Sequence, residues 1–127
     1  MAGPRILLVE DDPDIQRLVT TVLSKEYEVR TANDGLEGLM TIEHGFRPDL
    51  VIADIMMPRL DGMSFVKALK GHRETNRIPV MFLTAKGAPR EVVEGINAGA
   101  RYYLTKPFKM DELLQKVHRL LPPLPPK

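Results

Sequence analysis

The fold is indicated by residues 5–23, RILLVEDDPDIQRLVTTVL. Residues 5–9 form a short apolar run that ends abruptly at three acids, positions 10–12, a pattern typical of a strand buried on both faces. After Pro13, apolar side chains recur at helical spacing between residues 15 and 23, and proline is favoured in the first turn of a helix. The stretch therefore predicts a buried strand, a charged loop and a helix.

The same alternation recurs along the rest of the chain. Further strands are predicted at residues 27–31, 49–53, 78–83 and 102–104, and further helices after residues 33–35, through residues 63–69, at about 89–98 and at 110–121. Five strands alternating with five helices predict an α/β fold, because each crossover between parallel strands returns through a helix. We expect a doubly wound, flavodoxin-like, five-stranded parallel sheet, and we place its strands in the order 2-1-3-4-5 by analogy with that fold.

Length and composition limit what the chain can be. With 127 residues, 43% hydrophobic and 28% charged, it fits one compact domain. We assign residues 1–121 to this domain and residues 122–127, PPLPPK, to a proline-rich tail or linker stub, since proline cannot continue a helix.

Charge and targeting signals narrow the function further. A net charge of +1 leaves no basic excess to neutralise phosphates, so we expect no direct nucleic-acid binding by this chain. No apolar run approaches the roughly 20 residues that span a bilayer. Because the sequence also lacks cysteine and a signal-peptide pattern, we expect a soluble, cytoplasmic protein that does not contact membranes.

Reactive side chains follow four of the predicted strands. Glu10 and Asp11 follow the first strand, Asp54 the third, Thr84 the fourth, and Thr105 and Lys106 the fifth. Because the carboxyl ends of parallel strands meet at one edge of a sheet, we expect these groups to lie together. Clustered carboxylates repel one another and favour a bound cation, and oxygen donors favour Mg²⁺. The histidines at positions 44, 72 and 118 are expected on the solvated surface, so zinc is not expected.

This cluster suits phosphoryl chemistry. Asp54 could attack phosphorus to form an acyl phosphate, while a metal and Lys106 neutralise the transferring oxygens and Thr84 donates a hydrogen bond to one of them. Singly, each residue has a simpler explanation, since Asp11 or Asp12 could merely cap the following helix. The joint occurrence of these groups at four strand ends favours a functional cluster.

The segments that carry this chemistry resemble those of the receiver domains of two-component response regulators. They are ILLVEDD (6–12), DLVIADIMMP (49–58), DG (61–62), LTAK (83–86) and YLTKPF (103–108). Their order and spacing are those of the family from residue 6 to about residue 121. The resemblance implies a CheY-like domain that accepts a phosphoryl group from a histidine kinase or a phosphotransfer protein.

Roles for individual residues follow from the resemblance. It implies that Asp54 is the phosphoacceptor, that Asp11 and Asp54 bind Mg²⁺, that Glu10 acts mainly through water, and that the Met56 backbone carbonyl completes the protein ligands. Thr84 and Lys106 are implied to bind phosphoryl oxygens, and the peptide bond between Lys106 and Pro107 is implied to be cis, which only bonds preceding proline reach at low cost.

The resemblance also implies a switch. Thr84 and Tyr103 are its matching residues, and the responding face is formed by the fourth helix (about 89–98), the fifth strand and the last helix. This face would control a downstream protein or a missing output domain, and it could form a phosphorylation-dependent homodimer. Tyr102 is expected to be half-buried, with its hydroxyl in water. Arg101, Tyr102 and Leu60 depart from common family patterns, which leaves partner identity and dimer preference open.

Two other functions compete with this one. A phosphorylation-independent interaction module would keep the fold, but such proteins typically lose an acid, the threonine or the lysine, and this chain retains them all. A phosphatase of the haloacid dehalogenase type would carry a second acid two residues after the nucleophile, where this chain has Met56. We therefore expect a signalling domain that catalyses only its own phosphorylation and dephosphorylation, not a turnover enzyme.

Overall fold

The computed structural model describes residues 3–55, 62–85 and 102–122. In chain order its elements are β1 (Arg5–Val9), α1 (Pro13–Leu23), β2 (Glu28–Ala32), α2 (Gly35–Glu43), β3 (Leu50–Asp54), α3 (Gly62–Lys70), β4 (Val80–Ala85), β5 (Tyr102–Lys106) and α5 (Met110–Leu120). The helix predicted at about 89–98 lies outside the described residues, as do Met56 and residues 123–127 of the tail. The boundary between domain and tail stays a prediction.

The strands form one parallel sheet in the order β2-β1-β3-β4-β5, which confirms the predicted topology. The register places Asp54 of β3 opposite Leu83 of β4, and Thr84 of β4 opposite Thr105 of β5. Successive strands therefore bring their carboxyl ends to one edge of the sheet.

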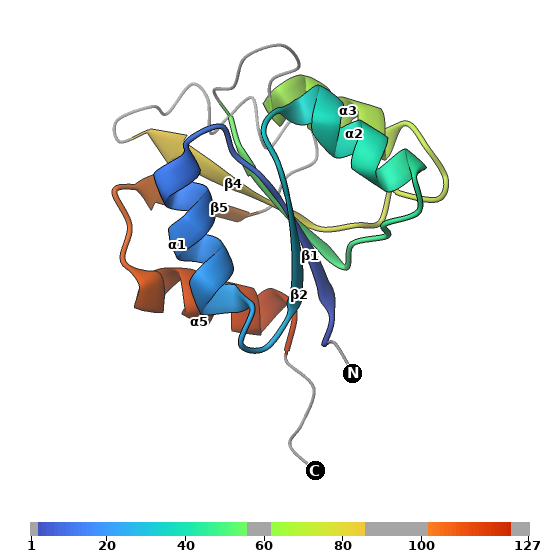
Figure 1. Ribbon diagram of the computed structural model, residues 1–127. Coiled ribbons are helices and arrows are strands. Elements are labelled where there is room, and N and C mark those ends of the chain that lie inside the picture. Colours follow the sequence, from blue (N-terminus) through green and yellow to red (C-terminus); the bar gives the residue numbers. More distant parts are fainter. Residues whose placement is uncertain (1–2, 56–61, 86–101, 123–127) are drawn as a thin grey trace.

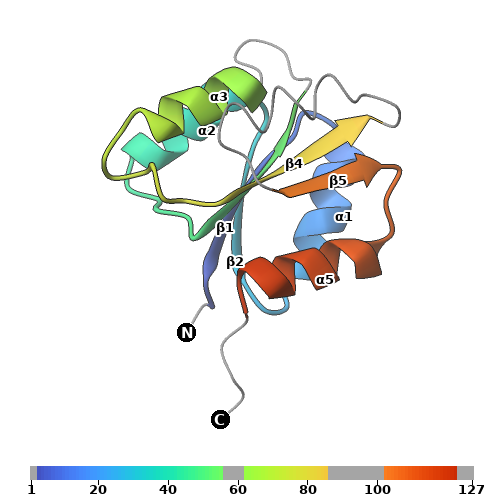
Figure 2. The same cartoon turned by 180° about the vertical axis from the view of Figure 1, so that it is seen from behind.

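Helices cover both faces of the sheet. Figures 1 and 2 show α1 and α5 on one face and α2 and α3 on the other. Side chains alternate between the faces along each strand, so β3 sends Leu50 and Ile52 toward Val19 and Leu113, and sends Val51 and Ala53 toward a second core that contains Phe65. The inward strand residues are apolar on both faces, as expected for a doubly covered parallel sheet.

Strand limits differ from the predictions by one or two residues at several ends, and turn hydrogen bonds explain two of the starts. The amide of Tyr27 bonds to the Leu23 carbonyl at 2.9 Å, so Tyr27 belongs to the turn after α1 and β2 begins one residue later. The amide of Ile78 bonds to the Thr75 carbonyl at 3.1 Å, so β4 begins at Val80. In the described part of the chain, no helix has the length and apolarity needed to cross a membrane.

Candidate functional site

Three carboxylates meet at the carboxyl edge of the sheet. Ligand oxygens of Glu10, Asp11 and Asp54 all lie within 4.8 Å of one another. Glu10 follows β1 and is fully buried, Asp54 ends β3 and is 8% exposed, and Asp11 is exposed. The structure therefore brings together the acids that the sequence placed at the ends of the first and third strands.

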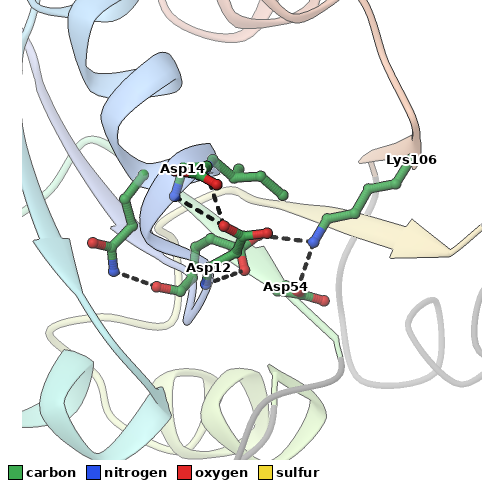
Figure 3. Close-up of polar contacts among 7 residues, drawn as sticks. Asp12, Asp14, Asp54 and Lys106 are labelled. Carbon is green, nitrogen blue, oxygen red and sulfur yellow. Dashed lines mark hydrogen bonds and ion pairs between the residues drawn. The ribbon is translucent and has the colours of Figure 1, made fainter.

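Lys106 joins this cluster from the end of β5. Its Nζ lies 2.9 Å from Glu10 Oε1 and 2.7 Å from Asp54 Oδ2. Figure 3 shows the long side chain extending from its strand to Asp54. Strand alternation explains the meeting, because Glu10, Asp54 and Lys106 continue the series of side chains that face α1 and α5. The peptide bond between Lys106 and Pro107 is cis.

The charges of this cluster are not balanced. Burial raises the pKa of Glu10 to about 7, and the nearby charge of Asp54 adds to the rise, although hydrogen bonds from Lys106 and from the Asp12 amide oppose it. Burial alone would lower the pKa of Lys106, but its hydrogen bonds to Asp54 and Glu10 outweigh that effect and raise it. Two buried carboxylates thus share one ammonium, and the exposed carboxylate of Asp11 stands beside them. Such an oxygen-rich, acidic cluster suits a hard divalent cation.

The loop between β1 and α1 contains two neighbouring acids, Asp11 and Asp12, with different hydrogen-bonding surroundings. Asp12 is the N-cap of α1, and its carboxylate accepts hydrogen bonds from the amides of Asp14 and Ile15 at 2.9 and 3.4 Å. Within residues 3–55, 62–85 and 102–122, the Asp11 carboxylate has no hydrogen bond or ion pair. Helix capping therefore explains the presence of an acid at position 12, but it does not explain the acid at position 11.

Thr84 and Tyr103 lie on the opposite face of the sheet from Lys106. Thr84 is 2% exposed at the end of β4. Tyr103 is half-buried, its ring centroid lies 6.2 Å from that of Phe82, and burial raises the pKa of its hydroxyl. Strand alternation puts Thr84, Phe82 and Tyr103 on one face. Tyr102 is half-buried on the other face, against the core beside α1 and α5.

The histidines lie away from the acidic cluster. His44 and His72 are exposed, as predicted. His118 departs from the prediction, because it is partly buried and its Nε2 lies 2.5 Å from Glu26 Oε2. The last turn of α5 packs against the turn after α1, so His118 also lies near the Tyr27 ring, with centroids 6.4 Å apart.

Sequence reasoning missed two polar residues beside the acids, Gln16 and Asn33. The Gln16 side-chain amide donates to the backbone carbonyl of Glu10 and, at 2.9 Å, to Asn33 Oδ1. Gln16 sits within the amphipathic pattern of α1, and Asn33 sits in a turn before α2. No local pattern marks either residue, because their contact depends on the pairing of β1 with β2.

Residues 6–118 match the response regulator receiver domain family. The chain belongs to this family. A receiver domain is a signalling domain of two-component systems, so the fold and the acidic edge described above are those of a signalling protein.

Relatives of this receiver domain include transcriptional regulators. It is 40% identical over 119 residues to the DNA-binding dual master transcriptional regulator RpaA of Synechocystis, covering 93% of this chain and 49% of RpaA. It is 41% identical over 118 residues to the response regulator MprA of Mycobacterium leprae, covering 92% of this chain and 50% of MprA. The receiver domain thus spans about half the length of these curated relatives.

Among solved structures, the chemotaxis response regulator CheY4 of Vibrio cholerae is similar over almost its whole length. The two share 35% sequence identity with a TM-score of 0.86, and the match covers 93% of this chain and 98% of CheY4. The similarity therefore extends over the whole sheet and its helices.

Proposed function

We propose that this receiver domain accepts a phosphoryl group on Asp54 in a Mg²⁺-dependent reaction. The observation that carries the proposal is the contact of Lys106 Nζ with both Asp54 and Glu10, at 2.7 and 2.9 Å, beside the carboxylate of Asp11. These groups lie at the carboxyl ends of three different strands or directly after them. A buried carboxylate next to a cation-binding acid pair and a lysine has the components that phosphoryl transfer requires.

The acids fit Mg²⁺ by their donor chemistry. Asp11 and Asp54 would bind the ion directly, Glu10 would act mainly through water, and the backbone carbonyl of Met56 would complete the protein ligands. When bound, Mg²⁺ would supply positive charge for the oxygens of the transferring phosphoryl group. The shared burial of Glu10 and Asp54 supports this assignment, because burial raises the pKa of Glu10 and an extra cation would offset both that effect and the smaller contribution of the Asp54 charge.

The protein's own groups then have defined tasks. A carboxylate oxygen of Asp54 attacks phosphorus, and the bond from phosphorus to the donor breaks. That bond's electron pair leaves with the histidine nitrogen of a kinase or the acetate oxygen of acetyl phosphate. Lys106, already at the acceptor carboxylate, would shift its hydrogen bond to a phosphoryl oxygen, and the Thr84 hydroxyl would donate to another. Hydrolysis of the acyl phosphate would return Asp54 to its starting state.

The response to phosphorylation would pass to the face that contains β5 and α5. Phosphorylation adds roughly −1.5 to −2 charges at neutral pH, and movement of Thr84 toward this charge would open space for Tyr103 on the same face of the sheet. A histidine kinase or phosphotransfer protein would supply the phosphoryl group. Because the chain spans about half of RpaA and MprA, we propose that it controls an output domain or separate protein partner, with homodimer formation through this face. The cytoplasm would be the site of this exchange.

Mass spectrometry of the intact protein tests the proposal directly. The protein is incubated with acetyl phosphate, with Mg²⁺ or with EDTA, and then weighed. We expect one phosphoryl adduct only with Mg²⁺, no adduct in Asp54→Ala, and a normal adduct in Asp14→Asn, a matched control in the exposed first turn of α1. A full adduct in Asp54→Ala would refute the assignment, and no adduct in the native protein would favour a phosphorylation-independent interaction module.

A further inference from the structure

The backbone carbonyl of Glu10, which directly precedes Asp11, accepts a hydrogen bond from a side chain. Gln16, at the end of the first turn of α1, folds back so that its Nε2 donates to the backbone carbonyl of Glu10. The same nitrogen donates its other hydrogen to Asn33 Oδ1 at 2.9 Å. The side-chain amide of Gln16 therefore connects the acidic loop after β1 with the loop after β2 through two hydrogen bonds.

The bond at Glu10 also controls the position of Asp11. The peptide unit is planar, so its carbonyl oxygen, the following amide nitrogen and the next Cα move together. Fixing the Glu10 carbonyl therefore fixes the orientation of the peptide that leads to Asp11. The Asp11 carboxylate itself forms no hydrogen bond or ion pair in the described part of the chain. Its position thus depends on its backbone, which Gln16 holds on one side and the Asp12 cap holds on the other.

Asn33, the second partner of the Gln16 amide, is itself held by hydrogen bonds. Asn33 Nδ2 donates to Glu37 Oε2 at 3.1 Å, and the Glu37 amide donates to the carboxylate of Asp34, the buried N-cap of α2, at 2.9 Å. The contacts therefore continue from the acidic loop, through Gln16 and Asn33, into the first turn of α2. The Gln16 side chain is thus held by partners on both sides before any ligand binds. It loses little further conformational freedom on binding, which is the condition for preorganisation.

We propose that Gln16 is a positioning residue for the metal site, with Asn33 as its support. Its amide holds the peptide between Glu10 and Asp11 so that the Asp11 carboxylate is presented beside Asp54 before Mg²⁺ binds. This inference rests on the proposed Mg²⁺ site and adds a residue that does not touch the ion. Partners of this outer kind typically change metal affinity by 10–100-fold when they are removed.

Isothermal titration of Mg²⁺ into Gln16→Met, together with urea unfolding of the same variant, tests the proposal. Methionine keeps the length of the side chain and removes both donors. Gln115→Met on α5 is the matched control, since Gln115 is an exposed helical glutamine far along the chain from the acids. We expect Gln16→Met to weaken Mg²⁺ binding about tenfold, and we expect Gln115→Met to bind like the native protein.

A second variant keeps the test decisive if Gln16→Met unfolds. Asn33→Ala changes an exposed residue and removes only the support, so we expect a smaller loss of Mg²⁺ affinity than in Gln16→Met. Native Mg²⁺ affinity in folded Gln16→Met, or in Asn33→Ala if Gln16→Met unfolds, would overturn the role of Gln16 while leaving the metal site intact. Absence of Mg²⁺ binding in the native protein would overturn the metal site and this inference together.

Discussion

Replacing Lys106 with methionine would leave two buried carboxylates without their cation. The ammonium donates to Glu10 at 2.9 Å and to Asp54 at 2.7 Å. Hydrogen bonds to charged groups contribute about 1.5–3 kcal/mol each, and removing one partner of a buried ion pair costs about 3–5 kcal/mol. Because the Lys106 side chain is 25% exposed, water would partly replace it, and we expect a loss of about 3 kcal/mol in unfolding free energy near pH 8 without metal.

The size of this loss should depend on pH in a definite direction. The pKa of folded Glu10 is about 7, above the ordinary value of 4.5. Protonation of Glu10 therefore stabilises the folded state, and this contribution is complete below pH 4.5 and is lost as the pH rises through 7. Losing Lys106 removes an interaction that lowers the pKa of Glu10. In the variant, the unfolding free energy therefore continues to fall with rising pH beyond the pH at which it levels off in the native protein. We expect the variant's deficit to shrink to about half near pH 5.5, where Glu10 is protonated and its charge no longer needs Lys106.

Urea unfolding followed by circular dichroism at both pH values, in EDTA, measures these losses. Lys67→Met is the matched control, because Lys67 is exposed on α3, and we expect it to change stability by no more than about 0.5 kcal/mol. A deficit below about 1 kcal/mol near pH 8 would refute the view that Lys106 offsets buried charge. Equal deficits at both pH values would refute the part assigned to Glu10.

Three further outcomes follow from the same contacts. Glu10→Gln should raise the unfolding free energy in EDTA near pH 8 by about 1 kcal/mol, since it removes a buried charge and leaves Lys106 paired with Asp54; a loss of stability in urea titrations would contradict this. Mg²⁺ affinity measured by calorimetry should fall as the pH is lowered through about 7, because protonation of Glu10 removes negative charge from the cluster. Equal affinities near pH 6 and pH 8 would count against a place for Glu10 in the metal site. Tyr27→Phe should cost about 1 kcal/mol by removing the hydrogen bond from its hydroxyl to the Leu121 carbonyl, with Mg²⁺ affinity unchanged, and a change in that affinity would show coupling between α5 and the acids.

Local patterns in the sequence determined the elements and the type of site. The apolar runs at β1 and β3 and the helical periodicity of α1 and α5 act over a few residues, so they can be recognised without neighbours. The acids after β1 and β3 were predicted to converge because parallel strands end at one edge. The exact starts of β2 and β4 were not predictable in this way, since turn hydrogen bonds compete with the ladder at those positions.

Tertiary structure alone decided which polar groups from distant segments touch. Lys106 and Glu10 are 96 residues apart, and the register between strands determines that one amine reaches two carboxylates. The Gln16 contact with Asn33 and the His118 contact with Glu26 likewise join segments that are distant in sequence. Residue types and spacing specify what each segment can form, but a hydrogen bond between segments requires distances and directions that only the packed sheet and helices fix.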